Sequence, residues 1–132
     1  MKNIKLILVI ISSCLFLNTY AIQNRDIPPK IIEAMQVGNA IELAKYFNSS
    51  IELAIFDKED IYSKQQAEQI IKSYFEKNKI KTFIVLHQGG KEGAKYAICN
   101  LETTENKIFR VYFLIKENNG KPLIHQMRIE EE

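Results

Sequence analysis

The most informative stretch of the chain is residues 63–77, SKQQAEQIIKSYFEK. Ser63 is a favourable helix N-cap, and Gln66 stands three residues later, where its side chain can bond back to the cap in a capping box. Apolar side chains then recur at helical spacing, at Ala67, Ile70, Ile71, Tyr74 and Phe75. This spacing predicts an amphipathic helix over residues 63–77, with one face packed on a large apolar surface.

Four stretches after this helix have the composition and the alternation of β-strands. They cover residues 80–88, 94–104, 107–117 and 122–130. Short turn sequences separate them, and the last turn contains Asn119-Gly120, the favoured pair of a type I′ hairpin. Consecutive hairpins predict an antiparallel meander.

Two shorter helices and a strand are expected before residue 63. A helix is expected to open at Asp26-Ile27-Pro28-Pro29, with Asp26 or Ile27 as its cap, and to close at Gly38, because proline suits a first helical turn and glycine suits a helix end. Asn39 followed by Glu42 predicts the start of a second helix. Residues 51–55 alternate apolar with polar or small side chains, as in a short half-buried strand.

The order of these elements, α-α-β-α-β-β-β-β, predicts one α+β domain. Particular stretches add to this order: Ile27-Pro28, Gly38-Asn39-Ala40, Leu43-Ala44-Lys45-Tyr46-Phe47, Tyr62-Ser63-Lys64, Gln66-Ala67-Glu68, Gly93-Ala94-Lys95-Tyr96-Ala97-Ile98, Phe109-Arg110-Val111-Tyr112 and Arg128-Ile129-Glu130. The chain resembles the nuclear transport factor 2-like, or cystatin-like, cone superfamily. Its local sequence resembles an uncharacterised family of small exported bacterial proteins with that fold.

This resemblance implies N-terminal helices packed on a strongly curved antiparallel sheet that leaves a cavity. It implies no activity, because the matching stretches are packing and turn positions. Cys99 departs from the small residue expected at its position, so the resemblance gives that thiol no role.

The first 21 residues have the three parts of a secretory signal. Lys2 and Lys5 form the basic part, residues 4–17 form an apolar run, and Thr19-Tyr20-Ala21 supplies small residues before a cleavage site. We expect cleavage after Ala21, which leaves a mature domain of residues 22–132. The protein would then be exported, either to the periplasm or out of the cell.

A lipoprotein signal is the alternative interpretation. Ile11-Ser12-Ser13-Cys14 fits the lipobox pattern, in which an acylated Cys14 would anchor the protein to the membrane. The apolar run continues through Leu15-Phe16-Leu17, whereas lipid-anchored chains usually become polar there. We therefore favour ordinary cleavage.

The charge of the mature chain argues against a nucleic-acid partner. Cleavage removes two of the 18 Lys and Arg residues and none of the 16 Asp and Glu residues, which leaves a formally neutral chain. Proteins that bind nucleic acid need a basic excess or a basic cluster. Cleavage also leaves Cys99 as the single cysteine, so no intramolecular disulfide can form.

No motif for a nucleotide or a metal occurs in the sequence. The chain has no glycine-rich phosphate loop, no Cys-x-x-Cys and no His-x-x-x-His, and its two histidines are His87 and His125. We expect no cofactor and no metal site.

Alternation along the strands predicts which side chains face the core. On the last strand these are Leu123, His125, Met127 and Ile129; on the strand before it they are Phe109, Val111, Phe113 and Ile115; on the strand over 94–104 they are Ala97, Cys99 and Leu101. No carboxylate faces inward in this register. We expect a cavity lined by Tyr74, Ile71, Val111, Phe113, His125 and Met127.

His125 and Cys99 are the catalytic candidates, because they are the reactive groups on the predicted inner face. An imidazole can lower the pKa of a thiol and accept its proton, so a thiolate nucleophile with a histidine base is chemically sound. The structural alternative is a core histidine beside a buried thiol that behaves as a small hydrophobe.

The predicted outer face of the sheet is rich in aromatic and aliphatic side chains, namely Tyr96, Ile98, Tyr112, Leu114 and Ile124, together with Arg110. Tyrosine and arginine are enriched at interfaces, so a homodimer that pairs through this face is one expectation. The alternative is an ordinary half-exposed sheet with scattered apolar residues.

The leading hypothesis for function is a non-catalytic binding or interaction module that works outside the cytoplasm. Its contact surface would be a mainly apolar cavity for a small ligand, or a sheet face for a protein partner. The alternative is a small isomerase, dehydratase or hydrolase with His125 as its base. An inward carboxylate bonded to a tyrosine in an open pocket would favour the enzyme.

The exported form should begin at Ile22, because Thr19 and Ala21 are the best small pair at the end of the apolar run. The intact mass of the protein recovered from the cell envelope or the medium tests this. A mass that fits a diacylated chain starting at Cys14 would contradict both the cleavage site and the unanchored form.

Overall fold

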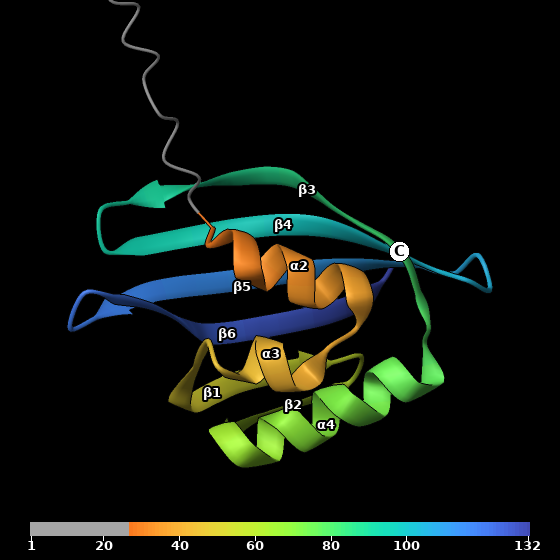
Figure 1. The fold of residues 1–132 in the computed structure, drawn as a ribbon, viewed down its shortest axis with the longest axis horizontal. Helices are drawn as coiled ribbons and strands as arrows, with labels where there is room; N and C mark the ends of the chain where they lie inside the picture. The colour runs from red at the N-terminus through yellow and green to blue at the C-terminus, as the bar shows by residue number, and fades with distance from the viewer. Residues whose placement is uncertain (1–26) are drawn as a thin grey trace, which may run out of the picture.

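A computed structural model describes residues 27–132 of the chain (Figure 1). The expected signal segment of residues 1–21, the predicted cut after Ala21 and the alternative anchor at Cys14 lie outside the described residues. Within residues 27–132, no helix is long and apolar enough to cross a membrane.

The described chain forms helices on one side of a single sheet (Figure 1). The helices are α2 (Pro29–Val37), α3 (Ala40–Ala44) and α4 (Lys64–Lys77). The strands are β1 (Phe47–Ile55), β2 (Lys58–Ser63), β3 (Ile80–Lys91), β4 (Ala94–Thr103), β5 (Ile108–Asn118) and β6 (Lys121–Glu131). They lie in the order β2-β1-β6-β5-β4-β3. The predicted α+β class is confirmed.

Neighbouring strands run antiparallel except for β1 and β6, which are parallel. The register breaks at several points, where one strand carries an extra residue that the next strand does not pair. Leu86 is such a residue on β3, and His125 is one on β6. Because bulges bend a strand and increase its twist, these breaks curve the sheet around the helices.

Capping side chains fix where α4 and α3 begin. The Ser63 hydroxyl accepts a hydrogen bond from the Gln66 backbone N–H at 3.2 Å, and the Gln66 side chain accepts one from the Ser63 N–H at 3.1 Å. On α3, the Asn39 side chain accepts from the Glu42 N–H at 3.1 Å. Both predicted capping pairs are confirmed.

The apolar face of α4 is buried as its spacing predicts. Its buried side chains are Ala67, Ile71, Tyr74 and Phe75. The helix packs against α3, β1 and β2, whereas α2 covers the opposite part of the sheet near β3. The core therefore lies between the helices and the concave side of the sheet.

The hairpin between β5 and β6 has the predicted turn. Asn119 and Gly120 both have positive φ angles, of 52° and 76°, as a type I′ turn requires. The four C-terminal strands extend over nearly the predicted residues, so the meander is confirmed.

Strand β2 is an addition to the predicted order of elements. Its residues, Lys58–Ser63, pair with β1 at the edge of the sheet, and nearly all of them are exposed. An edge strand has one neighbour and little to bury, so it tolerates charged side chains that hide the usual alternation.

The bulge at His125 changes which side chains of β6 face the core. Ile115 pairs with Ile124 and Leu114 pairs with Gln126, so His125 has no partner on β5. The extra residue shifts the alternation of side chains by one position. Residues of β6 before His125 therefore face the opposite side of the sheet from the side that unbroken alternation predicts. Ile124 is consequently buried, whereas Leu123 and His125 are half-buried and lie outside the core cluster. The expectation that Leu123 and His125 face the core is wrong for this reason.

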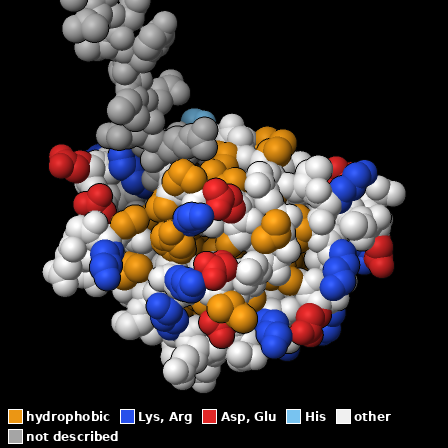
Figure 2. Space-filling model, viewed as in Figure 1, with side chains coloured by type: hydrophobic (Ala, Val, Ile, Leu, Met, Phe, Trp, Pro, Cys, Tyr) orange, Lys and Arg blue, Asp and Glu red, His pale blue; other side chains and the backbone are white. Residues whose placement is uncertain are grey.

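The helix-covered face is not uniformly polar. Figure 2 shows apolar side chains in the middle of this face, with Lys, Asp and Glu side chains among and around them. Val37 at the end of α2 and Ile41 in α3 are two exposed apolar residues of these helices.

Ile71→Asp should prevent stable folding, whereas Lys72→Asp should not. Ile71 is completely buried under α4, and its neighbour Lys72 is exposed on the same helix. An unpaired buried carboxylate costs several kcal/mol, against a typical total stability of about 5–15 kcal/mol. Thermal unfolding followed by circular dichroism compares the two variants, and equal melting temperatures would contradict the packing of α4.

Candidate ligand pocket

A pocket of about 560 Å³ lies between α4 and the hairpin formed by β1 and β2. Its size is within the range of small-molecule sites, about 300–1,000 Å³. The lining residues come from β1, the following turn, β2 and α4, and are Leu53, Ile55, Phe56, Asp57, Lys58, Tyr62, Ile70, Ser73, Tyr74, Lys77 and Asn78.

Strand alternation and helical spacing bring these side chains together. Leu53 and Ile55 are on the face of β1 that is turned toward α4, and Lys58 pairs with Ile55 across the hairpin. On α4, Ile70 and Tyr74 are four residues apart and therefore share a face. The walls of the pocket are mainly apolar, and the charged side chains come from its turn and its helix end.

Tyr74 carries a buried hydroxyl and lines the pocket. The side chain is 5% exposed, and its hydroxyl oxygen is buried without a hydrogen-bond partner among the described residues. Burial raises the pKa of the Tyr74 hydroxyl, so the group stays protonated and can donate. A buried donor left unsatisfied costs about 1–3 kcal/mol, which is a reason to expect an acceptor to reach it.

An aromatic cluster surrounds Tyr74. Its ring centroid lies 6.4 Å from that of Phe56, 5.9 Å from that of Phe75 and 5.9 Å from that of Phe109. Edge and tilted contacts at these distances are favourable between aromatic rings. The cluster fixes the Tyr74 ring and leaves its hydroxyl covered by neighbouring side chains.

Phe56 occupies an unfavourable backbone conformation in the turn between β1 and β2. Its φ angle is +54°, a region that normally takes glycine, and a bulky residue there costs about 1–3 kcal/mol. Its N–H donates to the Ile129 carbonyl at 3.0 Å, and its ring lies 5.6 Å from that of Phe109. The side chain is nevertheless 46% exposed at the pocket. These contacts hold Phe56 in a strained backbone conformation in the lining of the pocket.

Three charged side chains lie around the pocket, namely Asp57, Lys58 and Lys77. All three are exposed, and none of them makes an ion pair or a side-chain hydrogen bond with another described residue. The pocket thus carries two cations and one carboxylate that are free to meet a ligand.

Of the residues expected to line a cavity, Tyr74 lines this pocket. The others on that expected lining, apart from His125, are completely buried in the core: Ile71, Val111, Phe113 and Met127. Large side chains fill the space over the middle of the sheet, as the contact between the rings of Phe83 and Phe113 at 6.4 Å illustrates. The expected position of the cavity is corrected accordingly, from the middle of the sheet to the β1–β2 end.

His125 lies at the bulge of β6 and does not line this pocket. Its Nε2 atom is buried and has no hydrogen-bond partner among residues 27–132. Burial lowers the pKa of the imidazole, and the positive charge of Lys116 lowers it further. These conditions favour a neutral ring at physiological pH.

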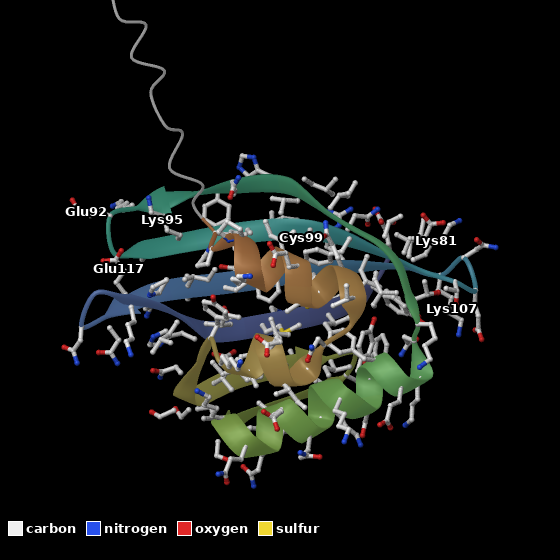
Figure 3. The ribbon with its side chains drawn as sticks, in the orientation of Figure 1. Lys81, Glu92, Lys95, Cys99, Lys107 and Glu117 are labelled. Carbon is white, nitrogen blue, oxygen red and sulfur yellow. The ribbon has the colours of Figure 1, made fainter. Side chains whose placement is uncertain are left out.

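Cys99 lies in the core, on β4 and behind α2, whereas the labelled charged residues lie at the two ends of the strands (Figure 3). It is completely buried, and burial raises the pKa of its thiol from 9.0 to about 12. Cys99 on β4 is in register with Val111 on β5 and, through it, with Ile129 on β6. His125 is therefore two strands away from Cys99 and lies four residues before Ile129 on β6. At ordinary strand spacings the two Cα atoms are about 15 Å apart, and the predicted Cys–His pair is not formed.

The outer sheet face contains most of the side chains expected there. Tyr96, Ile98, Tyr112 and Leu114 are half-buried on it, beside Arg110. Ile124 is an exception, because the bulge turns it into the core. Pairing of two copies through this face stays a prediction.

No group of three or more His, Cys, Asp or Glu side chains in the described part of the chain could hold a metal ion. The polar side chains that line the pocket are Asp57, Lys58, Tyr62, Ser73, Tyr74, Lys77 and Asn78.

The sequence patterns did not predict most of the residues of this pocket, because they did not predict strand β2. The turn at Phe56-Asp57 and the start of the strand at Lys58 follow a recognisable strand, and Ile61-Tyr62 is an apolar pair just before the cap of α4. A two-residue break after Ile55 was the signal that could have indicated a hairpin there.

The architecture has the fold of nuclear transport factor 2-like and cystatin-like proteins. A nuclear transport factor 2-like protein of unknown function from Shewanella baltica OS155 has a similar structure, with a TM-score of 0.62 over 79% of this chain and 86% of that one, at 15% identity. A domain with a cystatin-like fold from Nostoc punctiforme has a TM-score of 0.63 over 79% of this chain and 72% of that one, at 9% identity. At such identities these likenesses concern the fold alone.

The chain belongs to the DUF4783 family, a domain of unknown function, whose model matches residues 28–130. A member from Bacteroides ovatus ATCC 8483 is 34% identical, with a TM-score of 0.77 over 81% of this chain and 96% of that one. A member from Bacteroides uniformis ATCC 8492 is 33% identical, with a TM-score of 0.76 over 80% of this chain and 97% of that one. Comparison with curated proteins finds no match.

Cys99 should resist thiol reagents in the native state and react only on unfolding. Burial raises the pKa of the Cys99 thiol from 9.0 to about 12 in the folded chain. As the pH rises, the thiol of the unfolded chain therefore loses its proton at a lower pH than the thiol of the folded chain. The contribution of this thiol to stability is therefore full well below pH 9 and is lost as the pH rises toward 12, by about 1.4 kcal/mol at pH 10. Urea unfolding at pH 8 and pH 10 measures this decrease.

Cys99→Ala is the control, because it removes the thiol and should make the decrease between pH 8 and pH 10 smaller. Rapid labelling of native Cys99 near pH 6 would contradict the buried thiol and would favour the enzyme over the binding module.

Proposed function

We propose that this protein is an exported, non-catalytic binding module whose pocket between α4 and the β1–β2 hairpin takes a small, mainly apolar ligand. The observation that carries the proposal is the buried Tyr74 hydroxyl, which has no partner among the described residues of a pocket with apolar walls. A ligand that offers an acceptor would satisfy this donor.

The apolar walls supply most of the expected affinity. Leu53, Ile55 and Ile70 line the pocket, and removing apolar surface from water is favourable by about 25 cal/mol per Å². A few polar groups within such a pocket orient the ligand, as is usual for small-molecule sites. Tyr74 is in the position to serve as that orienting group.

The composition of the lining supports binding rather than catalysis. Asp57 is the one carboxylate among the lining residues, it is exposed, and it makes no hydrogen bond with Tyr74. General acid–base chemistry needs a titrating group held within hydrogen-bond reach of the substrate. His125, the base of the enzyme hypothesis, is not among the lining residues.

Export is the second part of the proposal and depends on residues 1–21. Their basic, apolar and small-residue parts in succession are typical of a secretory signal. A ligand that this protein meets would therefore be one that occurs outside the cytoplasm.

A neutral fluorescent probe, N-phenyl-1-naphthylamine, should bind the protein with increased emission, because apolar walls remove it from water. Ser73→Trp should reduce its affinity at least tenfold, since Ser73 is exposed in α4 and lines the pocket. Fluorescence titration measures the affinity.

Gln65→Trp is the matched control, because Gln65 is exposed on the same helix and does not line the pocket. It should leave the affinity for the probe unchanged. Absence of probe binding, or equal loss in the two tryptophan variants, would contradict the assignment of the pocket as the binding site.

A further inference from the structure

We infer that the ligand of this pocket is an amphipathic carboxylate, whose anionic group lies between Lys58 and Lys77 and whose apolar body lies along α4 and β1. The inference rests on the proposed function, because it names the class of ligand that the same pocket takes.

The two lysines reach the pocket from different elements. Lys58 begins β2 directly after the turn, and Lys77 is in the last turn of α4. Neither makes an ion pair with another residue in the described range 27–132. An anion can therefore approach both cations without breaking an ion pair within this part of the protein. The C-terminal end of a helix favours a cation, so the position of Lys77 can be explained without a ligand. Lys58 is not at a helix end, so this explanation does not apply to it.

Tyr74 adds a donor beside these cations. It stands three residues before Lys77 on the same face of α4, and its hydroxyl lacks a partner among the described residues. A carboxylate has two oxygens, so one can accept from the hydroxyl while the other meets a lysine. Charge-assisted hydrogen bonds of this kind are stronger than neutral ones.

Phe56 has to move for the carboxylate to reach Tyr74. The Tyr74 hydroxyl oxygen is buried, and the Phe56 ring lies at a centroid distance of 6.4 Å. Phe56 is half-exposed, so its ring can turn outward into solvent, which breaks its contacts with the rings of Tyr74 and Phe109. The anionic group then occupies the space that the ring leaves.

Asp57 opposes an anion and sets a limit on its affinity. It precedes Lys58 in the turn, is exposed, and reduces the net charge around the pocket to +1. Replacing this carboxylate should therefore strengthen the binding of an anion.

The apolar body of the ligand must be compact. The pocket holds about 560 Å³, and aliphatic side chains from both α4 and β1 line it. A saturated chain of moderate length fits these walls, and decanoate is a suitable probe, with decanol as its neutral counterpart and decyltrimethylammonium as its cationic one.

The experiment measures the binding of all three compounds to the protein of residues 22–132 by isothermal titration calorimetry, below their micelle concentrations. Decanoate should bind about tenfold more tightly than decanol, and decyltrimethylammonium should bind more weakly than either. The preference should decrease with added salt, because the lysines are exposed.

Three variants assign the preference to named groups. Lys58→Gln combined with Lys77→Gln should bring the decanoate affinity down to that of decanol. Lys64→Gln combined with Lys72→Gln, two lysines of α4 that do not line the pocket, should change neither affinity. Asp57→Asn should increase the affinity for decanoate a few-fold.

The outcomes separate this inference from the proposed function. Binding of the neutral probe with equal affinities for decanoate and decanol would overturn the inference and leave the binding pocket intact. A preference for decanoate that survives in the double variant at Lys58 and Lys77 would also overturn it. Failure of both decanoate and the neutral probe to bind would overturn the inference and the proposed function together.

Discussion

The packing of α4 on the concave side of the sheet is the contact on which the rest of the structure depends. Ile71 and Phe75 bury the helix against the core, and the capping box at Ser63 fixes where the helix begins. The same packing fixes the distance between the helix and the β1–β2 hairpin. The pocket lies where that hairpin faces α4, beside the filled core.

Much of the fold could be predicted from local sequence patterns. The cap and the apolar spacing of residues 63–77 indicate α4, and Asn119-Gly120 indicates the last hairpin, because each signal depends on neighbouring residues in the chain. The parallel pairing of β1 with β6 could not be obtained in this way. It joins residues far apart in sequence, and no local pattern specifies which strands meet.

The candidate site was less predictable, for two physical reasons. Alternation gives the faces of a strand only while the register is unbroken, and the extra residue at His125 exchanges the faces of β6. Strand β2 is an exposed edge strand with charged side chains, so it lacks the alternation that would have predicted it. The pocket residues Phe56, Asp57 and Lys58 were therefore not predicted either. Tyr74 could be predicted because it belongs to the apolar face of α4, where the helical spacing of apolar residues is uninterrupted.

The central place of β6 has a consequence for how the chain acquires its structure during synthesis. This strand comes last in the described sequence, yet it pairs with β1 on one side and β5 on the other, so it joins two parts of the sheet. A nascent chain that lacks it has β2-β1 and β5-β4-β3 as separate pieces with unpaired edges. The ribosome must release the chain through β6 before the sheet can close. If the protein is exported, as we propose, this order leaves the sheet open until β6 has been made, and the pairing of distant strands would then follow translocation.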